Sequence, residues 1–354
     1  MICETASLDY RLPDHHLLRP AQFELISGRC EMVVAAVATL AHSSDGFWTP
    51  LLTSTTNPNE RWLAIDLLRF AAAFGVVWAH VVYPMPSAAI GYTAVALFLI
   101  FVPFVSVRHL AASGNRRAVD GGIVRTRRIL LPWLFWVAFY KAVLAYQARD
   151  PLEFVRLNDA AWLLVGPTIH LWFLPFIFMA IILLIPPARL IRDVRTLNIA
   201  CVAAFFVSAL ALYAHDYWRL TQPFAQWAFA LPPFLYGLLA AYGRKLGSRV
   251  GPMVFMTLVV VLSWLMGDAY WPSYLLLAML LFETSFLVRL KNPLFVALGG
   301  LAFGIYLIHP FFLLVWYKFS PMPQNLVLAA IFIFIASAAF AFVMRRTPWL
   351  RQFV

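Results

Sequence analysis

The sequence is poor in charged residues. Asp, Glu, Lys and Arg together make up 12% of its 354 residues, about half of the share that is usual in a soluble domain, and 63% of the residues are hydrophobic. Such a chain would expose too much apolar surface to be a water-soluble enzyme. The composition therefore predicts an all-α polytopic membrane protein that folds as a helical bundle.

Cysteine and the common soluble-enzyme motifs are also scarce. The three cysteines, Cys3, Cys30 and Cys201, are odd in number and far apart, which indicates neither a disulfide framework nor a metal-type spacing. The chain has no glycine-rich phosphate loop, no serine nucleophile elbow and no hydrophilic stretch large enough for a soluble catalytic domain. Any catalysis is therefore expected inside the bundle.

Long apolar segments fill the rest of the chain from residue 62 onward. They predict about ten transmembrane helices, several of them interrupted by prolines such as Pro103 and Pro175 that should kink a helix. The segments cover residues 62–83, 88–107, 129–147, 169–187, 198–214, 225–242, 252–267, 271–288, 294–316 and 326–344.

Three regions follow from this pattern. Residues 1–60 are mixed in character, and their apolar patch, residues 32–40, is too short to span a membrane, so we expect a cytoplasmic or disordered extension. Residues 61–346 form the integral membrane domain, and residues 347–354 are expected to be a cytoplasmic tail.

The positive charge follows the predicted topology. The net charge of +11 could indicate a nucleic-acid partner, but seventeen Lys or Arg residues follow the even-numbered segments and only four, Arg149, Arg156, Arg219 and Lys318, follow the odd-numbered ones. By the positive-inside rule, both termini are expected in the cytoplasm. Topology accounts for the charge, so no nucleic-acid partner is expected.

The first apolar segment carries three ionisable side chains, Asp66, Arg69 and His80. The helix from Trp62 to Tyr83 would be roughly 33 Å long, enough to cross a bilayer. At about 100° per residue the three side chains fall on one stripe, and each would cost on the order of 3 kcal/mol in lipid. The stripe is therefore expected to face the bundle interior.

Four stretches together resemble a known family. The run from Asp66 to Arg69 with His80 eleven residues later, the basic run RTRRILLP from Arg125, HLWFL from His170 and GIYLIHP from Gly304 resemble, in order, motifs of the acyltransferase-3 family of membrane O-acyltransferases. The chain departs from the family pattern at 101–104, where a Ser-Gly-aromatic turn is replaced by FVPF, and at Ala302, where a serine is common.

The resemblance implies an activity and a location. A protein of this family would transfer an acyl group, expected to be acetyl, from cytoplasmic acyl-CoA to a hydroxyl of an extracytoplasmic or lipid-linked glycan. It would lie among the lipids of a bacterial inner membrane and would hold no tightly bound cofactor. Acyl-CoA and the saccharide acceptor are its expected partners.

His80 is the first candidate catalytic residue. A neutral imidazole can accept a proton from a sugar hydroxyl near neutral pH, although an interfacial histidine can also serve only as a hydrogen-bonding group. Arg69 offers a planar fork of donors, and the resemblance implies a functional arginine at this position. Asp66, three residues earlier, can orient Arg69 or simply pair with it.

The other candidates each have a functional and a structural interpretation. Arg125 and Arg128 would bind the phosphates of coenzyme A, as the resemblance implies, or anchor the helix at the inner face. His170, Tyr306 and His309 would line the site or act as interfacial anchors. Glu283 is an intramembrane carboxylate that either serves the site or pairs with a basic residue.

The same residues could also serve a metal site or a transporter. Three histidines can hold zinc, but His80, His170 and His309 come from separate helices and no carboxylate or cysteine stands at a ligand spacing, so no metal is expected. A transporter could use the same charges, but the sequence shows no second copy of the Asp66-to-His80 pattern, which favours the enzyme. The missing Ser-Gly turn leaves an inactive family member as a third possibility.

Overall fold

The computed structural model describes residues 63–113, 117–155, 162–267, 271–320 and 325–354, with the side chains of 108–128, 162, 163 and 169 left out. Within these ranges all regular structure is helical and no strand occurs, which confirms the predicted all-α class. The extension predicted over residues 1–60 lies outside the described residues.

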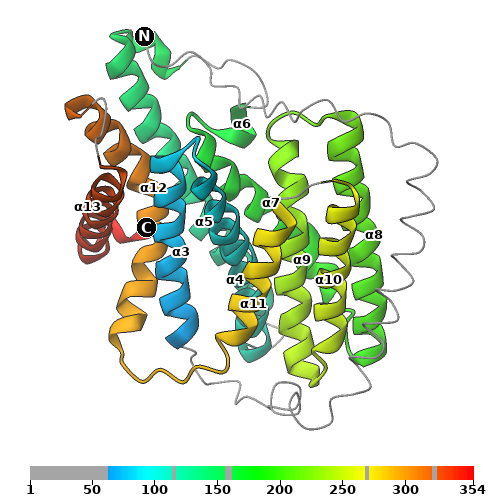
Figure 1. Cartoon of the computed structure of the whole chain (residues 1–354). Helices are drawn as coiled ribbons and strands as arrows, with labels where there is room; N and C mark the ends of the chain where they lie inside the picture. The colour runs from blue at the N-terminus through cyan, green and yellow to red at the C-terminus, as the bar shows by residue number, and fades with distance from the viewer. Residues whose placement is uncertain (1–62, 114–116, 156–161, 268–270, 321–324) are drawn as a thin grey trace. The chain divides into compact units, whose positions relative to one another are not determined.

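A long helix occupies each of the ten predicted segments (Figure 1). The helices are α3 (Leu63–Val82), α4 (Ile90–Ser113), α5 (Arg117–Ala148), α7 (Phe173–Ala188), α8 (Val194–Trp218), α9 (Phe224–Leu246), α10 (Val250–Leu265), α11 (Trp271–Thr284), α12 (Leu294–Phe319) and α13 (Leu326–Arg346). Four short elements lie between these helices, η1 (Pro86–Ala89), η2 (Pro151–Phe154), α6 (Trp162–Val165) and η3 (Ile169–Trp172), and η4 (Arg351–Phe353) follows α13.

Helix length separates these ten helices into two groups. In the described part of the chain, eight helices are long and apolar enough to cross a membrane, α7 with its 16 residues only when η3 is counted with it, over His170–Ala188. The other two, α10 and α11, have 16 and 14 residues, so they are roughly 24 and 21 Å long, shorter than a hydrocarbon core of about 30 Å. The predicted polytopic membrane bundle is confirmed, with two of its ten helices shorter than a full span.

Two helix starts differ from the sequence-based expectation. Helix α5 begins at Arg117, twelve residues before the apolar run, because the basic stretch before residue 129 continues the helix without a proline. Helix α7 begins at Phe173, which places Pro175 in the first turn, where a missing backbone N–H disrupts no helical hydrogen bond. Pro175 therefore lies where it cannot interrupt the helix, contrary to the kink that was expected.

Small residues let the central helices approach closely. A Cβ atom at Gly237 of α9 would collide with the backbone carbonyl of Ile100 in α4, and one at Gly299 of α12 would lie 2.6 Å from the backbone oxygen of Asp66 in α3. Helix α3 packs against both α4 and α12, and α13 covers α12 and α3 from outside (Figure 1). Close backbone approach at small residues is typical of helix packing in membranes.

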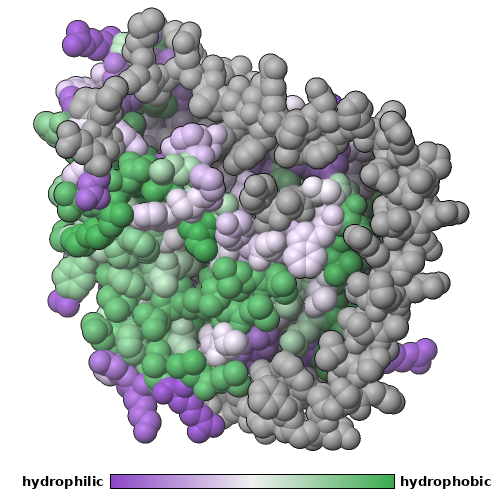
Figure 2. Space-filling view, viewed as in Figure 1, coloured by the Kyte–Doolittle hydropathy of each residue, from purple (hydrophilic) through white to green (hydrophobic). Residues whose placement is uncertain are grey.

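Large apolar side chains cover much of the outer surface. Examples on α7, α8 and α13 are Leu183, Ile199, Phe206 and Ile335, each of which is at least 59% exposed. Figure 2 shows apolar side chains across the middle of one face and hydrophilic side chains along its lower edge. A bilayer is the environment in which such a surface is stable, so the chain is an integral membrane protein.

The last residues pack onto the bundle. The Trp136 Nε1–H of α5 donates to the carbonyl of Phe353, at 3.0 Å, and the rings of Phe135 and Phe353 stack with centroids 4.4 Å apart. The side chain of Val354 lies against α12 at Gly304. Residues 347–354, expected as a tail, therefore include a segment that contacts α5 and α12.

The close crossing of α4 and α9 predicts a sensitive glycine. Gly237→Ala should lower the thermal stability of the detergent-solubilised protein strongly, because the new methyl group meets backbone rather than a movable side chain. Gly75→Ala is the matched control, since its methyl group would meet only the Ala94 side chain, at 3.1 Å. Equal unfolding temperatures for the two variants would contradict this packing.

Candidate active site

Three histidines from separate elements meet in the bundle. His80 lies near the C-terminal end of α3, and its ring centroid is 5.1 Å from that of His309 in α12. His170 in η3 lies on the other side of His309, with ring centroids 5.6 Å apart. Helices α3 and α12 run parallel, since Asp66 adjoins Gly299 and His80 adjoins His309. The structure thus brings together the three predicted histidines.

A tight turn and a tyrosine place His170. Gly166 has a φ of +82°, a conformation that side chains other than glycine rarely adopt, and the chain then enters η3. Tyr306 of α12 donates its hydroxyl hydrogen to the His170 carbonyl oxygen. The predicted site residue Tyr306 therefore ties α12 to the segment that carries His170.

Tyr140 is a member of the cluster that sequence reasoning missed. Its hydroxyl donates to the Leu307 carbonyl, at 2.7 Å, and its ring meets that of His170 edge-on with centroids 5.3 Å apart. The side chain is 1% exposed and belongs to α5. A tyrosine followed by Lys141 inside an apolar run, with no motif around it, gave no signal of this position.

The three histidines differ in how far they are exposed. His80 is exposed, whereas His170 and His309 are 5% and 1% exposed. The Nε2 atoms of both buried rings are inaccessible and have no hydrogen-bond partner. Of the three, His80 is therefore the residue that a dissolved or membrane-borne substrate can reach, and the other two are enclosed.

Asp66 and Arg69 form the ion pair that their spacing predicts. Arg69 Nη1 lies 3.5 Å from Asp66 Oδ1 within the first turns of α3, and Asp66 is buried while Arg69 is partly exposed. Eleven residues separate Arg69 from His80, which corresponds to about 16 Å along the helix axis. The pair and the histidine cluster therefore lie at different depths of the same helix.

For Arg125 and Arg128, the two residues predicted to bind coenzyme A, the structure describes the backbone only. Arg125 and Arg128 fall within α5, three residues apart and so on one side of the helix. Their side chains lie outside the described part of the structure. The binding of phosphates by these two residues stays a prediction.

Glu283 takes part in a separate buried network. Its Oε1 accepts from the Tyr236 hydroxyl at 2.7 Å, and its Oε2 accepts from Arg244 Nη2 at 2.5 Å. The Arg244 guanidinium carbon also lies 3.3 Å from the ring centroid of Phe286. Glu283 on α11 is therefore paired with a basic residue of α9, the structural alternative that the sequence left open.

Comparison with known families decides the class of protein. The acyltransferase-3 family profile, described as an acyltransferase domain, matches residues 62–346, most of the chain and all of the site described above. The chain belongs to the acyltransferase-3 family. It is a membrane acyltransferase, and the resemblance seen in the four motifs is confirmed. A search of curated proteins and a search of solved structures each found no match.

The acyltransferase has no ready metal-binding cluster in the part of the chain that the structure describes. Among these residues, no three His, Cys, Asp or Glu side chains are arranged to hold an ion. The His309 ring instead contacts those of His80 and His170, and the His170 ring also contacts that of Tyr306. Their arrangement suits proton transfer and hydrogen bonding.

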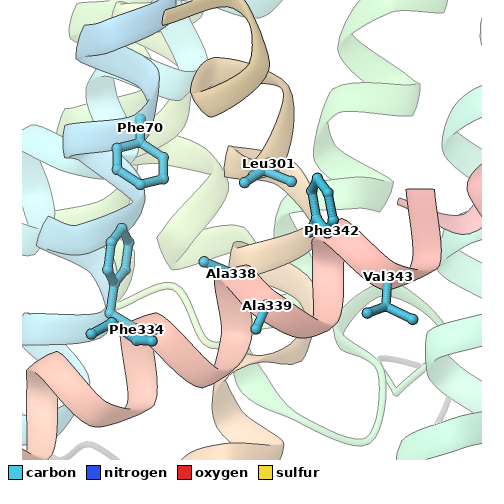
Figure 3. Close-up of a pocket in the computed structure, with 8 residues that line it drawn as sticks. Phe70, Leu301, Phe334, Ala338, Ala339, Phe342 and Val343 are labelled. Atoms are coloured by element: carbon cyan, nitrogen blue, oxygen red, sulfur yellow. The ribbon is translucent and has the colours of Figure 1, made fainter. Parts of the chain in front are cut away.

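An apolar groove of about 430 Å³ opens on the outer side of α3, α12 and α13. Phe70 and Phe334 line it and contact each other edge-to-face, with ring centroids 5.1 Å apart, and Leu301 and Phe342 line the same space (Figure 3). The lining is almost wholly apolar, so the groove offers no group for acyl transfer. A lipid chain of the surrounding bilayer fits its chemistry.

The Glu283 network yields a stability prediction. Arg244→Met should destabilise the acyltransferase by about 3–5 kcal/mol, because it leaves a buried carboxylate without its cation. Adding Glu283→Leu to that variant should restore most of the loss, since both charges are then gone. Thermal unfolding in detergent measures both changes. A fully stable Arg244→Met variant would show that the pair does not support the fold.

Proposed function

We propose that this acyltransferase moves an acetyl group from cytoplasmic acetyl-CoA to a hydroxyl of an extracytoplasmic or lipid-linked glycan in a bacterial inner membrane. The observation that carries the proposal is the exposed His80, which stands on the family's first helix with two buried histidines behind it. Membership of the acyltransferase family supports the reaction class.

His80 acts as the general base of the transfer. One ring nitrogen of a neutral imidazole takes the proton of the acceptor hydroxyl as its oxygen attacks the thioester carbonyl. The carbon–sulfur bond then breaks, the coenzyme A thiolate leaves, and the proton held by His80 returns to that sulfur. Base catalysis of this kind contributes about 10²–10⁴-fold to a rate.

Arg69 and Asp66 serve the donor side of the reaction. The guanidinium of Arg69 presents planar donors suited to a phosphate or to the carbonyl end of an acyl donor, and Asp66, at 3.5 Å, orients it. Arg69 is partly exposed, as a group that meets a ligand must be. The acyl-pantetheine arm of the donor would extend along α3 from Arg69 toward His80.

The charges of the loops support one orientation of the bundle across the membrane. Lys and Arg are concentrated in the loops that follow the even-numbered segments, so these loops, and both termini, are cytoplasmic. Arg125 and Arg128 then lie at the inner face, where the donor's phosphates are available, and the histidine cluster lies toward the outer face. One bundle would thus take its donor from inside and modify its acceptor near the outside.

Replacement of His80 tests the base. His80→Ala should lower acetyl transfer by at least about 10²-fold while the protein still inserts and elutes as a folded species, because the ring supplies proton transfer rather than packing. His215→Ala, at a histidine of α8 paired with Asp216, is the matched control and should keep normal activity. Product acetylation at the level of the control would remove His80 from the mechanism.

Replacement of Arg69 tests whether the reaction needs the planar guanidinium group of this residue. Arg69→Lys keeps the positive charge beside Asp66 but cannot reproduce two parallel donors, so turnover should fall even though the ion pair survives. Steady-state kinetics with purified protein measures this loss. Unimpaired turnover would leave Arg69 as a structural partner of Asp66 alone.

Membrane vesicles test the sidedness. Labelled acetyl-CoA added to inside-out vesicles should acetylate the acceptor, whereas sealed right-side-out vesicles should give no product. Replacing Arg125 and Arg128 together by alanine should raise the KM for acetyl-CoA more than the KM for the acceptor, because phosphate contacts are remote from the transferred group. Labelling confined to right-side-out vesicles would contradict the proposed orientation.

A further inference from the structure

The backbone of α12 contains a carbonyl group that no helical N–H can reach. Pro310 lies inside α12 and has no backbone N–H, so the carbonyl of Tyr306, four residues earlier, loses its helical donor. The Nδ1 atom of His309 lies 2.8 Å from this oxygen and 3.3 Å from the carbonyl oxygen of Ile305. The side chain of His309 thus takes the place of the missing backbone donor.

This contact determines the tautomer of His309. A carbonyl oxygen only accepts hydrogen bonds, so Nδ1 must carry the hydrogen. In the neutral ring Nε2 then has a free lone pair and no hydrogen. The ring is neutral because it is 1% exposed, and a charged imidazolium with an unpaired Nε2–H would be costly to bury there.

The free lone pair of His309 is enclosed, and the His309 ring has other histidine rings beside it. Its Nε2 atom is inaccessible and has no hydrogen-bond partner, so neither water nor a substrate has room to approach it. The His80 ring lies 5.1 Å away between centroids, and two imidazoles joined by an N–H···N bond are about 5 Å apart. The His170 ring is farther, at 5.6 Å, and turned by 64°.

We propose that His309 is the positioning residue for His80. No hydrogen bond joins the two rings in the structure, but they are close enough for one to form when the exposed His80 ring turns an N–H toward Nε2 of His309. Nε2 then accepts that N–H, which leaves the opposite nitrogen of His80 without a hydrogen and available to the acceptor hydroxyl. This inference rests on the proposed role of His80 as the base. When that nitrogen takes the hydroxyl proton, His80 becomes an imidazolium whose N–H donates to His309 until the proton passes to the leaving thiolate.

The arrangement gives Pro310 a function. In a regular helix the Tyr306 carbonyl would already be bonded, and the His309 ring would be free to adopt either tautomer or to turn away. Pro310 leaves that carbonyl available and so fixes the ring, through Nδ1, beside His80. The His-Pro pair at the end of the GIYLIHP run is therefore a unit that orients one ring.

Two substitutions at residue 309 separate orientation from packing. His309→Asn keeps an N–H donor at the position of Nδ1 but has no acceptor at the position of Nε2. His309→Gln can place its amide oxygen near the position of Nε2 and so keeps an acceptor. We expect kcat to fall at least about tenfold in His309→Asn, with little change in the KM for acetyl-CoA, and to recover in part in His309→Gln.

A spectroscopic measurement tests the geometry without turnover. In protein labelled with ¹⁵N-histidine and held in lipid nanodiscs, His309, assigned by its loss in the His309→Asn variant, should show a protonated Nδ1 and an unprotonated Nε2. The His80 signals, assigned by His80→Ala, should show one tautomer in the wild type and a mixture in His309→Asn. Pro310→Ala, which returns a donor to Tyr306, should shift the His309 signals.

The outcomes distinguish this inference from the proposed function. A hydrogen on Nε2 of His309 in the wild type, or His80 signals unchanged in His309→Asn, would overturn the positioning role whatever the reaction. Equal kcat in the Asn and Gln variants would overturn it as well. If the signals behave as expected but His80→Ala keeps full acetyl transfer, the ring contact stands and the base assignment fails.

Discussion

The close approach of α3 and α12 is the constraint on which the site depends. Gly299 lets the backbone of α12 lie against Asp66, and the two helices then run parallel until His80 meets His309. At the same helix, Gly304 accommodates Ala341 of α13. In a bilayer, helix association relies on packing and on polar contacts between helices, since lipid is as apolar as leucine. A larger residue at 299 would separate the rings as well as the helices.

The bundle contains two buried polar groups, the Tyr236–Glu283–Arg244 network and the histidine cluster. In the Tyr236–Glu283–Arg244 network, both carboxylate oxygens are paired and the arginine also contacts an aromatic ring. Nε and Nη1 of Arg244 nevertheless have no hydrogen-bond partner, and neither have Nε2 of His170 and of His309 in the histidine cluster. Each such buried atom costs about 1–3 kcal/mol, a cost that native structures typically retain at sites of function. The paired network joins α9 to α11, and the histidine cluster is the group on which the proposed chemistry rests.

The described residues also show why motif reasoning found most members of the histidine cluster but not all of them. His80, His170 and His309 stand in motifs that were recognised, and all three lie in the cluster. Tyr140 stands in no motif, yet it contacts His170 and α12. The stretch 101–104, where the family pattern has a polar turn, is a continuous part of α4, and Phe104 packs there against Phe282 with centroids 5.1 Å apart.

What the sequence by itself determined is local. The length and spacing of apolar runs predicted the ten helices, and the three-residue interval predicted the pair of Asp66 and Arg69, because both depend on neighbours within a few turns. The tertiary structure alone decided which distant residues meet. Tyr236 and Glu283 are 47 residues apart and bond because α9 and α11 lie within reach of each other, which no local pattern encodes. Likewise, Pro310 was visible in the sequence, but only the folded helix brings the freed Tyr306 carbonyl to His309 and its ring to His80.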